Sequence, residues 1–215
     1  MAFAAGRWLV SVALLLIAIV AVACAFVWFG VYDIGADAPH TRPVLVLVET
    51  LRDRSIEVRA RGLTPPPDLQ DPKRVLAGAG HYAGMCTGCH LAPGMGDSEI
   101  RPGLYPQPPN LSQEPVDPSE AFWVIKHGIK MSAMPAWGRT HDDATIWDMV
   151  AFVQQLPHLT PAQYRDIVAR APPDDDMDGA EPNHEHGHDA MPGMSMPDQH
   201  PAAPADHHDA KDPVH

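Results

Sequence analysis

Cysteine is scarce in this chain of 215 residues, which contains only Cys24, Cys86 and Cys89. Cys86 and Cys89 belong to one short motif, so Cys24 is left alone and no intramolecular disulfide framework is expected. Residues 60–170 lack a second Cys or His pair at ligand spacing, which argues against a zinc site at that motif. The chain also lacks a βαβ pattern, which argues against a thioredoxin-like redox pair.

Net charge is low outside one segment. The formal net charge is −12, and nine Asp and two Glu against one Lys put ten of these negative charges in residues 172–215. The acidity therefore belongs to the tail, and the net charge of the whole chain does not indicate what charge of partner the rest of the protein binds. The tail is rich in Asp, Pro and His and nearly free of large aliphatic residues, so we expect residues 172–215 to be disordered.

Residues 8–29 have no charged side chain over 22 positions. A helix of this length covers roughly 33 Å at ~1.5 Å per residue, enough for a hydrocarbon core of about 30 Å. Because Arg7 precedes the run, we expect residues 1–32 to hold a cytoplasmic N-terminus and a single-pass inner-membrane anchor, with a periplasmic remainder. The alternatives are a signal peptide cleaved after Ala23 and a lipid on Cys24, but the apolar run continues past both positions.

Residues 33–70 are expected to form a juxtamembrane helix at about 44–60, followed by a Pro-rich spacer at 64–67. Five Arg lie between positions 42 and 61. Two interpretations stay open for this helix: a solvated basic helix, or a helix lying on the headgroups of the membrane.

Residues 71–171 are predicted to be an all-α domain. Asp71, Asp117 and Thr160 are each followed by Pro, the pattern of a helix N-cap with Pro in the first turn. We expect the first helix to run through Met85 and the second to end at Gly128. A third helix opens with the acidic residues 142 and 143 and ends before Pro157, with Ile146, Met149, Val150 and Val153 as its core face.

Residues 86–90 read Cys-Thr-Gly-Cys-His, the C-x-x-C-H signature that attaches c-type haem. Cys86 and Cys89 can both reach the vinyl groups of one porphyrin, and His90 is then placed to ligate the iron. The Pro-rich loop at 91–116 is long for a small domain and needs something to wrap around, which a haem would supply.

The second axial ligand is predicted to be Met134. A thioether raises the reduction potential of haem iron, and Pro135 stiffens the loop that carries Met134. Met131 lacks the adjacent proline. His81 and His127 would give a bis-His iron, but both are expected to be residues of helix faces.

Residues 71–157 resemble a class I cytochrome c, and residues 1–157 are similar to membrane-anchored monohaem cytochromes of bacteria. The matching positions are Gly78 and Tyr82, the segment Pro109-Asn110-Leu111, Met134 with Pro135, and Phe152. The resemblance implies a class I fold around one covalent haem, with Phe152 packed on Gly78. It also implies that the Pro109 carbonyl accepts the N–H of His90, although the Pro-rich insert at 101–108 makes Pro102 a rival.

Further residues can contact the haem propionates. Tyr105 and Trp137 are candidate donors, and Arg101 or Arg139 can neutralise one propionate. For Trp123 we favour ordinary packing, since a Trp on a helix face is usually buried because it removes a large apolar area from water.

The tail contains a second group of candidate metal ligands: His184, His186, His188, Met191, Met194 and Met196. Imidazole and thioether together suit copper in either oxidation state. Copper binding is one interpretation of this segment, and a solvated tail is the other.

The sequence therefore predicts an electron carrier, not an enzyme, because an iron with two axial protein ligands leaves no open site. We expect redox protein partners and the membrane, with no nucleic acid and no small-molecule substrate. The alternatives are a copper-handling protein acting through its tail and a cytochrome subunit of a larger oxidase or dehydrogenase complex.

Overall fold

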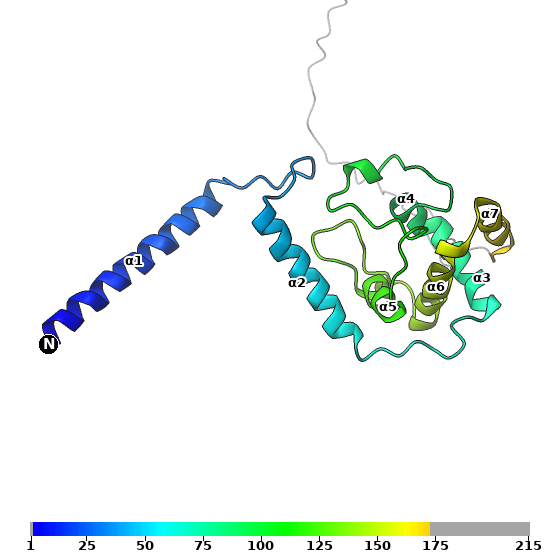
Figure 1. The fold of residues 1–215 in the computed structure, drawn as a ribbon, viewed down its shortest axis with the longest axis horizontal. Coiled ribbons are helices and arrows are strands. Elements are labelled where there is room, and N and C mark those ends of the chain that lie inside the picture. Colours follow the sequence, from blue (N-terminus) through cyan, green and yellow to red (C-terminus); the bar gives the residue numbers. More distant parts are fainter. Residues whose placement is uncertain (1, 173–215) are drawn as a thin grey trace, which may run out of the picture. The chain divides into compact units, whose positions relative to one another are not determined.

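The computed structural model describes residues 2–172, which form helices and loops without a strand in that range. The helices are α1 (Ala2–Trp28), α2 (Arg42–Ala60), α3 (Pro72–His81), α4 (Thr87–His90), α5 (Pro118–His127), α6 (Asp143–Gln155) and α7 (Pro161–Arg170). Helices α3 to α7 gather into one bundle, with long loops between α4 and α5 and between α5 and α6 (Figure 1). The prediction of an all-α fold is confirmed.

The helices of the bundle begin where side chains satisfy their free N–H groups. Asp71 accepts a hydrogen bond from Lys73 N, and Asp117 accepts from two backbone N–H groups of the first turn of α5. Thr160 and Gln163 form a reciprocal capping box at the start of α7. The predicted starts at 71, 117 and 160 are therefore confirmed. For α6, Asp142 is itself the N-cap, accepting from Thr145 N.

The first helix does not continue unchanged to Met85. α3 ends at His81, and a π-helical turn over Tyr82–Cys86 follows before α4 begins. The Thr87 N–H reaches back to the Tyr82 carbonyl, and the Thr87 hydroxyl donates to the same oxygen over 3.1 Å. Such single turns often occur at functional sites, and this one carries Met85 and Cys86 into the C-x-x-C-H motif.

The core lies where α3 crosses α6. A Cβ at Gly78 would lie 1.9 Å from the Asp148 carbonyl oxygen, so only glycine permits this approach. Phe152, the expected partner of Gly78, is buried on α6 and lies tilted against Tyr82 with ring centroids 5.5 Å apart. The atoms nearest to Gly78 are backbone atoms of Asp148 and Met149, about one helical turn before Phe152. The predicted core face of α6 (Ile146, Met149, Val150 and Val153) is buried, which confirms that expectation.

α2 packs against α5 of the helical bundle. Ala60 at its end is buried, and the Ser119 hydroxyl donates to the Leu63 carbonyl over 3.1 Å just beyond it. The helix begins two residues before the predicted position because Pro43 is accommodated in its first turn.

α1 contains one segment, Arg7–Trp28, that is long and apolar enough to cross a membrane. The apolar residues of this segment are not buried against the rest of the described chain. By length and composition alone, either a membrane anchor or a signal sequence fits this helix.

Candidate haem site

The two motif cysteines and His90 share one side of a short helical stretch. Cys86 ends the π-helical turn, and Cys89 and His90 are the last two residues of α4. Positions three and four apart face the same side of a helix, so residues 86, 89 and 90 point together. Both thiols are free, and burial, with a smaller contribution from Cys89, raises the pKa of the Cys86 thiol to about 12. A neutral sulfur suits a half-buried position that is to carry a thioether.

His90 is held by the backbone opposite. Its Nδ1–H donates to the Pro109 carbonyl over 3.0 Å, which leaves Nε2 as the nitrogen with a free lone pair. The acceptor is Pro109, and Pro102 lies instead in a 3-10 turn at Arg101–Gly103. Burial lowers the pKa of His90, the charge of Arg101 adds to this, and the bond to Pro109 opposes it. The imidazole is therefore neutral at neutral pH, as a metal ligand must be.

The chain directly after His90 is fixed by three hydrogen bonds that sequence reasoning missed. Leu111 N donates to the His90 carbonyl over 3.2 Å, and the buried Tyr82 hydroxyl donates to the Leu91 carbonyl over 2.6 Å. The Leu91 N–H also caps α4 by reaching Thr87 O. Leu91 has a positive φ of 62°, which is uncommon for a bulky residue. Nothing in the sequence signals that backbone conformation.

Arg101 lies against the segment that holds His90. Its Nη2 donates to the Pro108 carbonyl over 3.1 Å, next to the carbonyl that His90 uses. Its Nε is buried and has no hydrogen-bond partner among the described residues. Nη1 lies 3.8 Å from the Asp97 carboxylate, so the guanidinium keeps one donor near His90 that fits a carboxylate such as a haem propionate. Arg139, the other candidate, is exposed.

Met134 lies in a loop that opens where α5 ends at Gly128. Ile129 N donates to the Met134 carbonyl over 3.1 Å, and Met134 N donates to the Ser132 hydroxyl over 3.2 Å. The Met134 side chain is half-buried against the core of α5 and α6, as is that of Met85, which sequence reasoning did not single out. Met131, by contrast, is 99% exposed.

The remaining candidates occupy different surroundings. The Tyr105 hydroxyl accepts from His40 N over 3.2 Å, so it is tied to the segment between α1 and α2. Trp137 packs against the core of α5 and α6 and lies 5.7 Å from the His141 ring. The ring of Trp123 is tilted against that of His127, with centroids 5.0 Å apart, as expected for a packing residue.

The two histidines considered as alternative iron ligands lie on helices. His81 ends α3, with its ring 5.5 Å from that of His141, and His127 ends α5 and is exposed.

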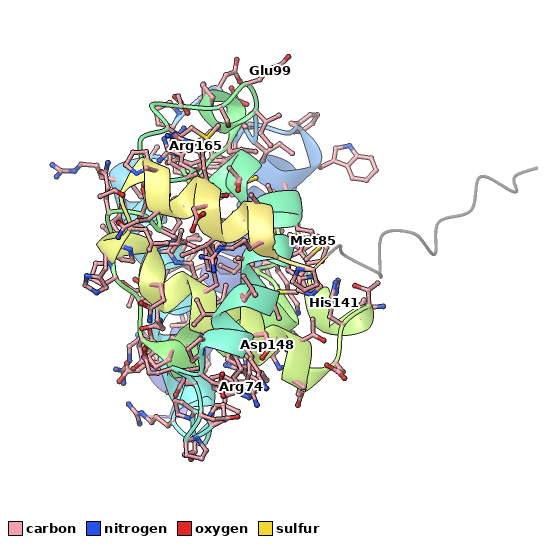
Figure 2. The ribbon with its side chains drawn as sticks, turned by 90° about the vertical axis from the view of Figure 1, so that its right-hand side faces the viewer. Arg74, Met85, Glu99, His141, Asp148 and Arg165 are labelled. Carbon is pink, nitrogen blue, oxygen red and sulfur yellow. The ribbon has the colours of Figure 1, made fainter. Side chains whose placement is uncertain are left out.

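In Figure 2, Met85 and His141 lie on one side of the bundle, and Arg74 of α3 lies beside Asp148 of α6, with which it forms an ion pair of 2.6 Å. The tail candidates His184, His186, His188, Met191, Met194 and Met196 lie outside the described residues. Within residues 2–172, no group of three His, Cys, Asp or Glu side chains is placed to hold a separate metal ion.

Two free thiols and a neutral histidine on one helical stretch, with an unpaired buried arginine donor nearby, fit one covalently bound haem. The profile of the family described as cytochrome c oxidase, cbb3-type, subunit III matches residues 73–153. This part of the chain is a monohaem cytochrome c domain. Comparison with curated proteins and with solved structures gave no match. The cytochrome c domain therefore includes α3 to α6, and the matched region leaves out α1, α2 and α7.

Proposed function

We propose that this cytochrome c domain is a membrane-tethered periplasmic electron carrier with His90 and Met134 as its axial ligands. The observation that carries the proposal is the 3.0 Å hydrogen bond from His90 Nδ1 to the Pro109 carbonyl. It fixes the ring and leaves Nε2 free on the helical stretch that carries Cys86 and Cys89. When bound, the haem supplies a one-electron Fe(III)/Fe(II) couple.

Met134 is the second ligand in this proposal because its side chain is held inside the domain. The Ser132 hydroxyl and Ile129 backbone fix its loop, whereas Met131 points into solvent. With His90 and Met134 both holding the haem iron, the iron would have no position left for a substrate. Electron transfer at the haem edge, without substrate binding, is the activity that this arrangement supports.

Paired substitutions in the holoprotein test the ligand assignment. Met134→Ala should abolish the weak charge-transfer absorption of methionine-ligated ferric haem and lower the reduction potential by on the order of 100 mV, because thioether ligation raises it. Met131→Ala, the matched control in the same loop, should leave both nearly unchanged. If the two variants exchange these behaviours, or if neither changes the spectrum, the assignment is wrong.

The tether in this proposal is α1. Its apolar segment is long enough to span a bilayer and has an arginine at its start. Full-length protein should remain in the membrane fraction after an alkaline wash, with its first residues still present by mass spectrometry. A mature N-terminus at Cys24 or later would mean that the segment is removed as a signal sequence or carries a lipid.

A second candidate function is that of a subunit in an oxidase complex, favoured by the family that residues 73–153 match. In that case the protein should co-purify from mild detergent with a terminal oxidase at fixed stoichiometry. Recovery as a free monohaem protein would support the separate carrier.

A further inference from the structure

α2 has one face that packs on α5 and an opposite face that is exposed. One face packs on α5 and ends at the buried Ala60. On the opposite face, Leu47 and Leu51 are each 68% exposed and Val58 is 52% exposed. Spacings of four and seven residues place these three side chains in one row along the helix, and spacings of three and four place Arg54 and Arg61 on the same side. No part of the described chain covers this row.

The apolar and charged residues of α2 are separated along its length. Positions 43–48 carry no charge, and Val46 is also 61% exposed there. The ion pairs lie further along: Arg52 with Asp53 at 2.8 Å, and both Arg54 and Arg61 with Glu57. α2 therefore has an apolar beginning and a charged end.

The chain itself brings this apolar beginning close to a bilayer. Only residues 29–41 separate the apolar segment of α1 from α2, a stretch that spans at most roughly 45 Å at ~3.4 Å per residue. The row is also narrow: a stable protein interface buries about 800 Å² on each partner, far more than three side chains offer. A helix with an apolar face and arginines toward its charged end is the form of a helix that lies in the headgroup region of a membrane.

We propose that α2 lies in the membrane–water interface, with Leu47 and Leu51 at the acyl boundary and Arg54 and Arg61 at lipid phosphates. This inference rests on the proposed function, because it requires α1 to be a membrane anchor. Since α2 packs on α5, and α5 leads directly into the Met134 loop, the interfacial helix fixes the ligand loop relative to the membrane. The domain then meets membrane-bound redox partners in one orientation.

The test uses full-length holoprotein with Cys24→Ala in vesicles of phosphatidylcholine, with or without phosphatidylglycerol. Cys86 and Cys89 are consumed by the haem, so a spin label attaches only to an introduced cysteine. Leu47→Cys and Leu51→Cys report on the proposed row. Ala169→Cys, on an exposed position of α7, is the control. Accessibility to oxygen, which concentrates in lipid, is compared with accessibility to a water-soluble nickel chelate.

We expect the oxygen-to-nickel accessibility ratio to be several-fold higher at 47 and 51 than at 169, in both lipid mixtures. Equal ratios at all three positions, in protein that still resists alkaline extraction, would overturn the interfacial helix while leaving the anchor intact. Protection of 47 and 51 from both reagents would mean that a protein surface covers the row, which also overturns the proposal. Loss of the protein from vesicles on alkaline washing would instead show that the anchor itself is wrong.

Discussion

Gly128 lies so close to Met134 that no side chain fits between them: a Cβ at Gly128 would be 2.8 Å from the Met134 carbonyl oxygen and 2.7 Å from the Pro135 carbonyl carbon. Gly128 also has φ 64° and ψ −175°, a conformation that is essentially restricted to glycine. The end of α5 and the Met134 loop are therefore one compact unit, in which Gly128 lies directly against the backbone of residues 134–136.

Gly128→Ala should move the Met134 loop, because the methyl group both clashes with it and forces the backbone out of a conformation that costs a non-glycine residue about 1–3 kcal/mol. The haem should stay attached through Cys86 and Cys89, while the charge-transfer absorption of methionine ligation weakens and the reduction potential falls. Gly103→Ala is the control, since a Cβ there would have nothing within 4 Å. Normal absorption and potential in Gly128→Ala would show that this glycine does not position the ligand.

The crossing of α3 and α6 gives a prediction about stability. Gly78→Ala places a methyl group 1.9 Å from the Asp148 carbonyl oxygen, so the helices must separate or the chain must bend. Overpacking of this kind costs about 1–3 kcal/mol, and we expect at least that loss in the free energy of unfolding measured with urea. Gly80→Ala in the same helix meets Pro172 O at 3.1 Å and Ala171 Cβ at 3.5 Å, near the end of the described chain, and should cost much less. Equal effects of the two substitutions would contradict the close crossing.

Sequence reasoning succeeded where a structural feature is local. The caps at Asp71, Asp117 and Thr160 depend on hydrogen bonds between residues two or three positions apart, so the sequence contains both partners side by side. The C-x-x-C-H motif is equally local, because its spacing alone places both thiols and His90 on one side of a helical stretch. These features predicted most of the helices and the cofactor.

Other features depend on contacts that the sequence does not display. Tyr105 was a candidate donor to a haem propionate, and the sequence did not show that its hydroxyl accepts from the backbone N–H of His40, 65 positions away. The His40 ring also bonds the Tyr32 hydroxyl. The π-helical turn before Cys86 likewise begins at Tyr82, whose buried ring lies against Phe152, 70 positions further along the chain. Such conformations follow from tertiary packing, which local propensity does not encode.

The position of Arg101 predicts an effect on redox potential. Its positive charge near His90 disfavours the more positive ferric state, so removing it should lower the reduction potential. We expect Arg101→Gln to lower it by on the order of tens of millivolts in spectroelectrochemical titration, because part of the charge is screened by solvent. Arg139→Gln, at an exposed position, should change the potential less. A larger shift in the Arg139 variant would indicate that Arg139 is the arginine near the iron.

The last prediction concerns the tail, whose sequence combines imidazole and thioether side chains. Full-length protein should bind copper, with His184, His186 and His188 leading for Cu(II) and Met191, Met194 and Met196 for Cu(I), following ligand softness. Histidine must lose its proton to bind, so the Cu(II) affinity should fall as the pH drops below about 6.5.

Competition against a copper chelator measures that affinity, and a protein carrying a scrambled tail of equal composition is its control. If the scrambled tail binds equally well, composition alone accounts for the binding and no built site exists. Truncation after Ala171 should remove the copper binding and leave the haem spectrum and potential unchanged, since none of the proposed haem ligands lies beyond that residue. A large change in potential on truncation would mean that the tail reaches the haem domain.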